Sequence, residues 1–277
     1  MRLTLFGEPA QDLAQTLLPL TQAARLHTLG PAHVCLYGLS QNLEEAHAAC
    51  RQAKLDFAFL PETAQLTDYR LFITDMDSTL INIECIDELA DLANCKTQVA
   101  RITEAAMQGK LDFNTALRER VALLAGLPET ALETVWQTRL KLNPGAKDWL
   151  LHLQTQGFKT ILVSGGFTYF TDRFKTELGF DEAYANQLEI KDGHLTGRLL
   201  GEVINAQAKK QKLLAACARY NIPPSQTLSA GDGANDLLMA QIAGLAIAYH
   251  AKPILQQIAQ CNINCAGFEV MPRLFAG

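Results

Sequence analysis

Two carboxylates two residues apart, Asp75 and Asp77, follow a short apolar run at Leu71–Thr74. Side chains at the end of one strand can address the same site while differing in environment, and therefore in pKa. One carboxylate could then attack a substrate as a nucleophile while the other carries a proton to the leaving group. The alternative for an isolated Asp-x-Asp-x-Thr sequence is ordinary turn or helix-capping chemistry.

A second acidic segment, Gly231–Asp236, follows another predicted strand, at 227–230. Its Asp232 and Asp236, together with Asp75, predict a Mg²⁺ site, because Mg²⁺ prefers oxygen ligands and shares the phosphate of its substrate. The segment lacks the spacing of an EF-hand, and Asp236 occupies the place of the third glycine of a dinucleotide-binding loop. A helix N-cap after a tight turn is the simpler interpretation, and it is compatible with a metal site.

The segment Ser164–Gly166 joins a predicted strand to a predicted helix. Its hydroxyl and backbone amides, at the positive end of that helix, could hold phosphate oxygens. A serine nucleophile is less favoured, because no Gly-x-Ser-x-Gly frame surrounds Ser164. Lys209, at a predicted helix start, could neutralise a phosphoryl group, although Lys209, Lys210 and Lys212 could equally form a solvated helix face.

These segments require a common framework, and the apolar pattern predicts one. After residue 145, helices and strands alternate, which indicates an α/β fold: a Rossmann-like, doubly wound, mainly parallel sheet. Ligands of such sheets bind beyond the carboxyl ends of the strands, where all three polar segments are expected. The predicted strands are 71–74, 160–163, 187–190, 195–199, 227–230 and 245–248, and the helices are 149–154, 168–177, 209–219, 236–243 and 253–260.

Two further regions differ from this alternating pattern. Residues 84–142 show helical spacing almost throughout, which predicts a helical cap inserted at about 82–143 within a core spanning 69–277. Residues 1–68 read as β-α-β-β-α-β, the order of a small ferredoxin-like α+β domain. Pro61–Asp68 is the expected linker between this domain and the core.

The composition limits the classes of partner. Of the 277 residues, 48% are apolar and 19% charged, and 24 basic against 29 acidic side chains leave a net charge of −5. A mildly acidic globular protein is not expected to bind nucleic acid or membrane surfaces. The N-terminal residues do not resemble a signal peptide. The seven cysteines are not spaced like a disulfide framework, and Cys261 and Cys265 have the spacing of only half a metal site. A cytoplasmic protein is expected, and a homodimer is one of the oligomeric states the sequence allows.

The order of these segments resembles the haloacid dehalogenase superfamily of aspartyl-phosphate phosphatases and, within it, the phosphoserine phosphatase family. The first 68 residues resemble the amino-acid-binding ACT-like domains attached to some members, without the glycine-rich loop of an effector site. The superfamily resemblance spans about residues 70–255 and rests on Asp75–Leu80, Glu84 with Ile86–Glu88, Leu117–Val121, Val163–Phe167, Gly231–Asp236 and Ala248–Pro253.

The resemblance implies a role for each matching residue. Asp75 would be the phosphorylated nucleophile, and Asp77 would protonate the leaving serine oxygen and then deprotonate the hydrolytic water. Asp75 and Asp232 would bind Mg²⁺ through carboxylates, Asp77 through its backbone carbonyl, and Asp236 would support the metal from nearby. The other residues would bind substrate: Ser164, Gly165, Lys209 and Asn235 the phosphoryl group, Glu84 the ammonium, Arg120 the carboxylate, and Met107 and Phe113 as parts of the closing cap.

The expected activity is Mg²⁺-dependent hydrolysis of O-phosphoserine to serine and phosphate through an aspartyl-phosphate, the last step of serine biosynthesis. The enzymatic alternatives are phosphoryl transfer to another alcohol and action on a related small amino-phosphate. A non-catalytic amino-acid sensor is the alternative of another class, and the complete set of catalytic residue types speaks against it. A one-residue shift in the alignment would exchange Lys209 for Lys210.

Overall fold

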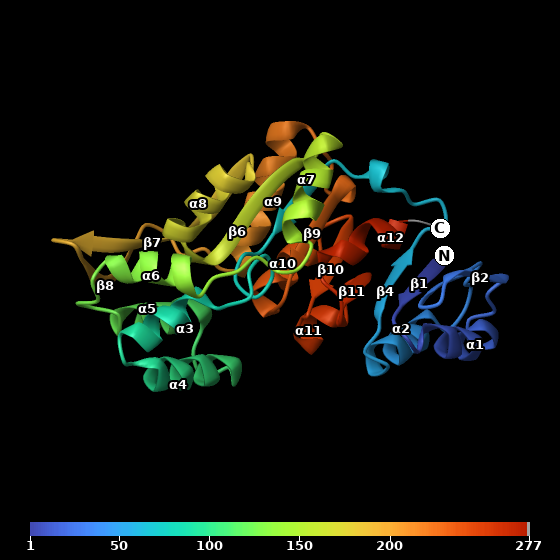
Figure 1. Cartoon of the computed structure of the whole chain (residues 1–277), viewed down its shortest axis with the longest axis horizontal. Helices are drawn as coiled ribbons and strands as arrows, with labels where there is room; N and C mark the ends of the chain where they lie inside the picture. The colour runs from blue at the N-terminus through green and yellow to red at the C-terminus, as the bar shows by residue number, and fades with distance from the viewer. Residues whose placement is uncertain (276–277) are drawn as a thin grey trace.

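The strands of the computed structural model, which describes residues 1–275, join into one mixed sheet of eleven strands (Figure 1). Their order is β2-β3-β1-β4-β11-β10-β9-β5-β6-β7-β8. The strands from β11 to β7 run parallel, whereas β8 and the first four strands pair antiparallel with their neighbours. The predicted α/β framework is therefore present, within a mixed sheet.

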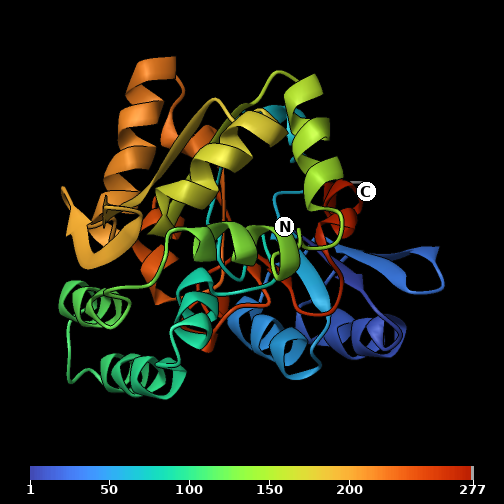
Figure 2. The ribbon, with the colours of Figure 1, turned by 60° about the vertical axis from the view of Figure 1, so that its left-hand side comes forward.

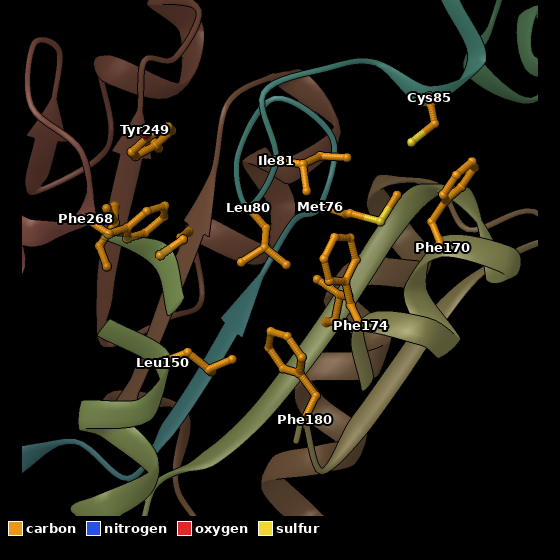
Figure 3. Close-up of a cluster of buried hydrophobic side chains, with 14 of the residues drawn as sticks. Met76, Leu80, Ile81, Cys85, Leu150, Phe170, Phe174, Phe180, Tyr249 and Phe268 are labelled. Carbon is orange, nitrogen blue, oxygen red and sulfur yellow. The ribbon is translucent and has the colours of Figure 1, made fainter. Parts of the chain in front are cut away.

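The parallel part of the sheet carries helices on both faces, because its strands are apolar on both sides. In β5, Phe72 packs against Trp149 on one face, whereas Ile73 belongs to the cluster with Leu213 on the other. Figure 3 shows part of the first cluster, in which Phe170 and Phe174, from the helix that follows β6, lie beside Met76. The strands are β5 (Leu71–Thr74), β6 (Lys159–Phe167), β7 (Glu182–Lys191), β8 (His194–Leu200), β9 (Thr227–Gly231), β10 (Leu245–Tyr249) and β11 (Cys261–Ile263). The helices are α7 (Ala146–Thr155), α8 (Thr168–Leu178), α9 (Ala206–Tyr220), α10 (Leu237–Ala240), α11 (Pro253–Gln256) and α12 (Met271–Phe275).

Four helices are inserted between β5 and α7, and they gather beside the β7–β8 hairpin (Figure 1). The chain enters and leaves this insertion through two adjacent segments, which Asn143 ties together by donating to the carbonyls of Thr79 and Ile81 at 2.7 and 3.1 Å. The far end of the insertion is attached to β8, where Gly126 N donates to Leu195 O at 2.8 Å. The helices are α3 (Cys85–Leu92), α4 (Lys96–Met107), α5 (Phe113–Ala122) and α6 (Thr130–Thr138).

The N-terminal unit and the inserted helices lie at opposite ends of the molecule in Figure 1, and at the lower right and lower left of the turned view in Figure 2. Leu3, Leu17 and Phe57 belong to the apolar cluster that its two helices share with the sheet. The C-terminal segment also contacts the unit, because the buried Arg2 donates to Leu274 O and Phe275 O at 3.4 and 3.1 Å. The unit comprises β1 (Arg2–Phe6), α1 (Ala10–Leu20), β2 (Arg25–Gly30), β3 (His33–Tyr37), α2 (Leu43–Gln52) and β4 (Asp56–Leu60).

Several boundaries differ from those predicted. Strand β6 continues through Phe167 instead of ending at Val163, and helices α10 and α11 end earlier than expected. Strand β11 and helix α12 were not predicted, because a strand of three residues is too short to show an alternating pattern. This strand pairs with β4 and so makes the two expected sheets continuous. Short 3-10 turns cover Leu66–Asp68, Pro224–Gln226, Ala234–Asp236 and Phe268–Val270.

No helix within residues 1–275 has both the length and the apolar character needed to cross a lipid bilayer.

Candidate active site

The three polar segments meet because β6, β5 and β9 are parallel neighbours in the sheet. Asp75 and Asp77 follow β5, Ser164 lies near the end of β6, and Asp232 follows β9. Met76 points into the apolar cluster (Figure 3), so the alternation of side chains turns Asp75 and Asp77 away from it. The convergence expected from the sequence is present.

Asp75 is held by donors on both carboxylate oxygens and is only 2% exposed. Met76 N donates to its Oδ1 at 2.7 Å, and Asn235 Nδ2 donates to its Oδ2 at 2.9 Å. Lys209 Nζ also lies 2.7 Å from Oδ2, and its side chain is fully buried. Burial alone would lower the pKa of Lys209, but the carboxylates of Asp236 and Asp75 raise it above its usual value. The structure therefore brings Lys209, rather than Lys210, to the buried carboxylates as a charged ammonium group.

The carboxylates of Asp75, Asp232 and Asp236 form the acidic cluster, with one oxygen from each lying within 4.8 Å of the others. Asp236 also contacts Lys209 Nζ at 2.7 Å and accepts from the backbone N–H of Asp232 at 3.1 Å. Burial and the nearby Asp75 raise the pKa of Asp232 to about 8, and the same two causes raise the pKa of Asp236 against the effect of Lys209. A divalent cation would relieve this repulsion, and three hard oxygen donors fit Mg²⁺.

Among the residues of the described chain, this acidic cluster is the only group of three or more His, Cys, Asp or Glu side chains arranged to hold a metal ion. Cys261 is buried in β11 and Cys265 is exposed, and both thiols are free. Neither cysteine belongs to the acidic cluster.

Asp77 lies beside Asp75 in a confined space. Its Oδ1 accepts from Cys85 N at 3.4 Å, and a Cβ atom at Gly166 would lie 2.5 Å from its Oδ2. Only glycine therefore leaves room for this carboxyl group. Burial, then Glu84 and Asp75, raise the pKa of Asp77 well above its usual range. A carboxyl group that retains its proton near neutral pH is suited to general acid catalysis.

The segment Ser164–Gly166 interrupts the pairing of β6 with β7, whose register shifts between Val163 and Phe167. The buried Ser164 hydroxyl accepts from Gly166 N at 2.8 Å. A Cβ atom at Gly166 would lie 3.0 Å from Ser164 Oγ and 2.5 Å from Asp77 Oδ2, so the Ser164 and Asp77 side chains both border Gly166. The predicted phosphate-binding segment thus borders the two catalytic candidates, as a bulge in a strand instead of a loop after one.

Asn186 supports this segment, although it was not among the site residues predicted from the sequence. Its Nδ2 donates to the carbonyls of Gly165 and Gly166 at 2.8 and 3.2 Å, and its Oδ1 accepts from Ile204 N at 2.8 Å. The side chain is 1% exposed. Its neighbours Ala185 and Gln187 are half-buried and exposed, so the local sequence does not distinguish Asn186 from a solvent-facing position of the strand.

Glu84 and Arg120 border the site from the inserted helices. Ser78 Oγ donates to Glu84 Oε1 at 2.6 Å. Although Glu84 keeps contact with solvent, surrounding protein raises its pKa and Asp75 adds to that effect. Burial lowers the pKa of the half-buried Arg120, while Asp87, Glu84 and the other nearby carboxylates oppose that shift. Within the described residues no carboxylate comes within 4.0 Å of this guanidinium group, so it can accept an anionic ligand.

The inserted helices contact the phosphate-binding segment through α5. A Cβ atom at Gly165 would lie 3.2 Å from the ring of Phe113, so the ring covers this glycine closely. The adjacent Asn114, also in α5, accepts a hydrogen bond through its Oδ1 from Asn205 Nδ2 of the core at 3.0 Å. Met107, the last residue of α4, is 74% exposed, and the structure does not pack it against the other site residues.

Comparisons with known proteins agree with this geometry. A family model described as haloacid dehalogenase-like hydrolase matches residues 69–244. A phosphoserine phosphatase of Polaromonas sp. is 49% identical over 210 residues, which cover 74% of this chain and 89% of the relative. A HAD family hydrolase structure from Salmonella enterica serovar Typhi covers 99% of this chain and 98% of its own, at 33% identity and a TM-score of 0.86. A probable phosphoserine phosphatase from Vibrio cholerae covers 99% and 86%, at 38% identity and a TM-score of 0.79. The chain therefore belongs to the haloacid dehalogenase-like hydrolases and, among them, to the phosphoserine phosphatases.

Proposed function

We propose that this protein hydrolyses O-phosphoserine to serine and phosphate through a phosphorylated aspartate, with Mg²⁺ as cofactor. The observation that carries the proposal is the buried contact of Asp75 with Lys209, next to a second carboxyl group, Asp77, whose pKa is raised well above its usual range. Relatives named phosphoserine phosphatase cover most of the chain, which supports this substrate. Phosphoryl transfer needs positioning and charge neutralisation more than elaborate covalent chemistry, and these side chains provide both.

Asp75 is the proposed nucleophile. Its carboxylate would form a bond to phosphorus as the bond from phosphorus to the serine oxygen breaks. Lys209 and Asn235 both donate to Asp75 Oδ2 in this structure, and the same donors would turn to the phosphoryl oxygens. Ser164 and the backbone of Gly165 would complete this cradle, beside the acidic cluster.

Asp77 is the proposed acid and base. Because its pKa is raised by burial and by Glu84, it would carry the proton that the leaving serine oxygen needs. The resulting carboxylate would then accept a proton from the water that attacks the phosphorylated Asp75. A raised pKa serves the first step, and the departure of serine admits water for the second.

The acidic cluster would hold Mg²⁺ through Asp75 and Asp232, with Asp236 nearby and the backbone carbonyl of Asp77 as a further ligand. When bound, the ion neutralises charge that develops on the phosphoryl oxygens. Asp236 would orient this site, since it also accepts from the backbone N–H groups of Asp232 and Gly233.

The amino-acid end of the substrate would be read by Glu84 and Arg120. A carboxylate suits the ammonium group, and a guanidinium group can bind a carboxylate through two hydrogen bonds. Phe113, and Met107 after movement of α4, would close the cap over the substrate. Such closure excludes water and strengthens the electrostatic contacts inside.

Residues 1–68 would form a ferredoxin-like, ACT-like domain beside a core of 69–277, with the cap at about 82–143. Its β2-β3-β1-β4 order and its antiparallel pairing support this assignment. A cytoplasmic location is consistent with seven free cysteines, six of them buried.

A phosphate-release screen over phosphorylated amino acids, with and without Mg²⁺, tests the proposal. Phosphoserine should be the preferred substrate, and Asp75→Asn should lower turnover by about a thousandfold or more while the variant stays folded. Asp192→Asn, in the exposed β7–β8 turn, is the matched control and should keep full activity. Appreciable hydrolysis by Asp75→Asn would exclude the nucleophile assignment. Product analysis with added alcohols separates hydrolysis from phosphoryl transfer.

A further inference from the structure

One buried carboxylate, Asp56, connects the N-terminal unit with the C-terminal segment of the chain. Asp56 begins β4 and is 3% exposed. It accepts from three consecutive backbone N–H groups, those of Asn264 and Cys265 at 2.5 and 2.7 Å and that of Ala266 at 2.9 Å. Hydrogen bonds to a charged acceptor are about twice as strong as neutral ones, so Asp56 fixes the 264–266 segment.

The 264–266 segment in turn holds His250, which lies just beyond the end of β10. Ala266 O accepts from the ring Nε2–H of His250 at 2.9 Å, and Ile263 O accepts from its backbone N–H at 2.7 Å. The backbone of His250 has φ 43°, in the left-handed region that only a few per cent of non-glycine residues adopt, among them Asn, Asp and His more often than others. Such a conformation persists only where neighbouring contacts impose it.

The turn that His250 begins reaches the acidic cluster. Two residues further on, Lys252 N donates to the carbonyl of Asp232 at 2.7 Å. Asp232 supplies one of the three clustered carboxylates. The Ala248–Pro253 sequence contributes no side chain to the proposed chemistry, and this backbone contact gives it a role.

We propose that Asp56 is a positioning residue for the metal-binding carboxylate of Asp232, acting through the 264–266 segment and His250. The inference rests on the proposed Mg²⁺ site. It assigns to the N-terminal unit an indirect part in shaping that site, through the turn that holds Asp232. Partners that orient a metal ligand from outside its coordination sphere typically contribute tenfold or more to metal affinity.

The test measures Mg²⁺ affinity by calorimetry without substrate, in the full-length chain. Asp56→Asn, which keeps the shape but removes the charge, should weaken Mg²⁺ binding by about tenfold. His250→Asn should have the same effect, because asparagine tolerates the left-handed backbone but cannot reach Ala266 O. If both act through one path, the double variant should be no worse than either single variant.

His47→Ala is the matched control. The His47 ring contacts Ala259 O at 3.0 Å, so it also joins the N-terminal unit to the core, but through a residue outside the 264–266 segment. This variant should bind Mg²⁺ like the wild type, whatever its loss of stability. Unchanged Mg²⁺ binding in Asp56→Asn or His250→Asn, or equal weakening in His47→Ala, would overturn the inference. A wild type that binds Mg²⁺ but does not hydrolyse phosphoserine would instead overturn the proposed function.

Discussion

Ser78 donates its hydroxyl hydrogen to the Glu84 carboxylate at 2.6 Å while its own backbone lies in the left-handed region, with φ 55°. Glycine adopts this conformation without the steric cost that serine bears. The position thus carries a strained residue whose side chain holds the group proposed to bind the substrate ammonium. We infer that the hydroxyl of Ser78 serves substrate specificity at some cost in stability.

Ser78→Gly should therefore separate stability from specificity. Relief of backbone strain should leave the free energy of unfolding unchanged or raise it by up to about 1 kcal/mol. Loss of a hydrogen bond to a charged group should raise KM for phosphoserine by about tenfold. Urea unfolding and steady-state kinetics measure the two effects. Hydrolysis of an aryl phosphate, which has no ammonium group, is the control, and an equal rise in its KM would contradict the specificity role.

Arg120→Ala should lower kcat/KM for phosphoserine by about a hundredfold, because the substrate carboxylate loses a charged, two-point partner. Hydrolysis of an aryl phosphate should stay within about threefold of the wild type, since that substrate has no carboxylate. Arg118→Ala, an exposed arginine on the same helix, is the matched control and should change neither rate. Equal losses on both substrates would show that Arg120 acts on the phosphoryl group or on the fold.

The convergence of Asp75, Ser164 and Asp232 could be predicted because the carboxyl ends of neighbouring parallel strands always meet at one edge of a sheet. Asp75 and Ser164 directly follow strand-forming residues of apolar character, and Asp232 directly follows β9. Local sequence patterns were sufficient to predict this site, because the parallel sheet brings the ends of its strands together.

Strand β11 and Asn186 could not be predicted in this way. The three residues of β11 form a strand only because β10 and β4 offer edges on either side of it. Asn186 joins Gly165 to Ile204, and this contact exists only because the β6–β7 register shifts beside it. Both features depend on neighbours that are distant along the chain, which no local periodicity records.

Asn186→Ala should weaken binding of inorganic phosphate more than binding of serine. Its amide fixes the carbonyls of Gly165 and Gly166, so its loss should raise the inhibition constant of phosphate by about tenfold and leave that of serine unchanged. Asn262→Ala is the control, because Asn262 is equally buried but donates to Ala259 O at 3.1 Å. If both variants lose phosphate and serine binding in parallel, Asn186 has only a structural role.

The stability of the metal-free protein should fall as the pH rises. The pKa of Asp232 is raised from its ordinary value of 3.8 to about 8, so between these values the folded chain binds a proton that the unfolded chain has lost. The free energy of unfolding therefore decreases with rising pH across this window. Mg²⁺ replaces that proton, so its stabilising effect should grow with pH.

Thermal unfolding with EDTA or with Mg²⁺ measures this linkage. The increase in Tm caused by Mg²⁺ should be several degrees larger at about pH 9 than at about pH 6. In Asp232→Asn, which cannot titrate at this position, most of that difference should disappear. A Mg²⁺ effect on Tm that is the same at both pH values in the wild type would contradict the raised pKa.

The hydrogen bond from Asn205 to Asn114 should help to hold the cap closed. Asn205 also caps α9 by accepting from Ala208 N at 3.0 Å, and the next residue of that helix is Lys209. Asn205→Ser keeps a good helix cap but is too short to reach Asn114, so it should raise KM for phosphoserine about fivefold, as should Asn114→Ala. The double variant should be no worse than either single one, because both remove the same contact.

Asn205→Ala, which also loses the helix cap, should in addition lower the free energy of unfolding by about 1 kcal/mol. Steady-state kinetics of the four variants decide the matter, and multiplicative effects in the double variant would show that the two residues act separately.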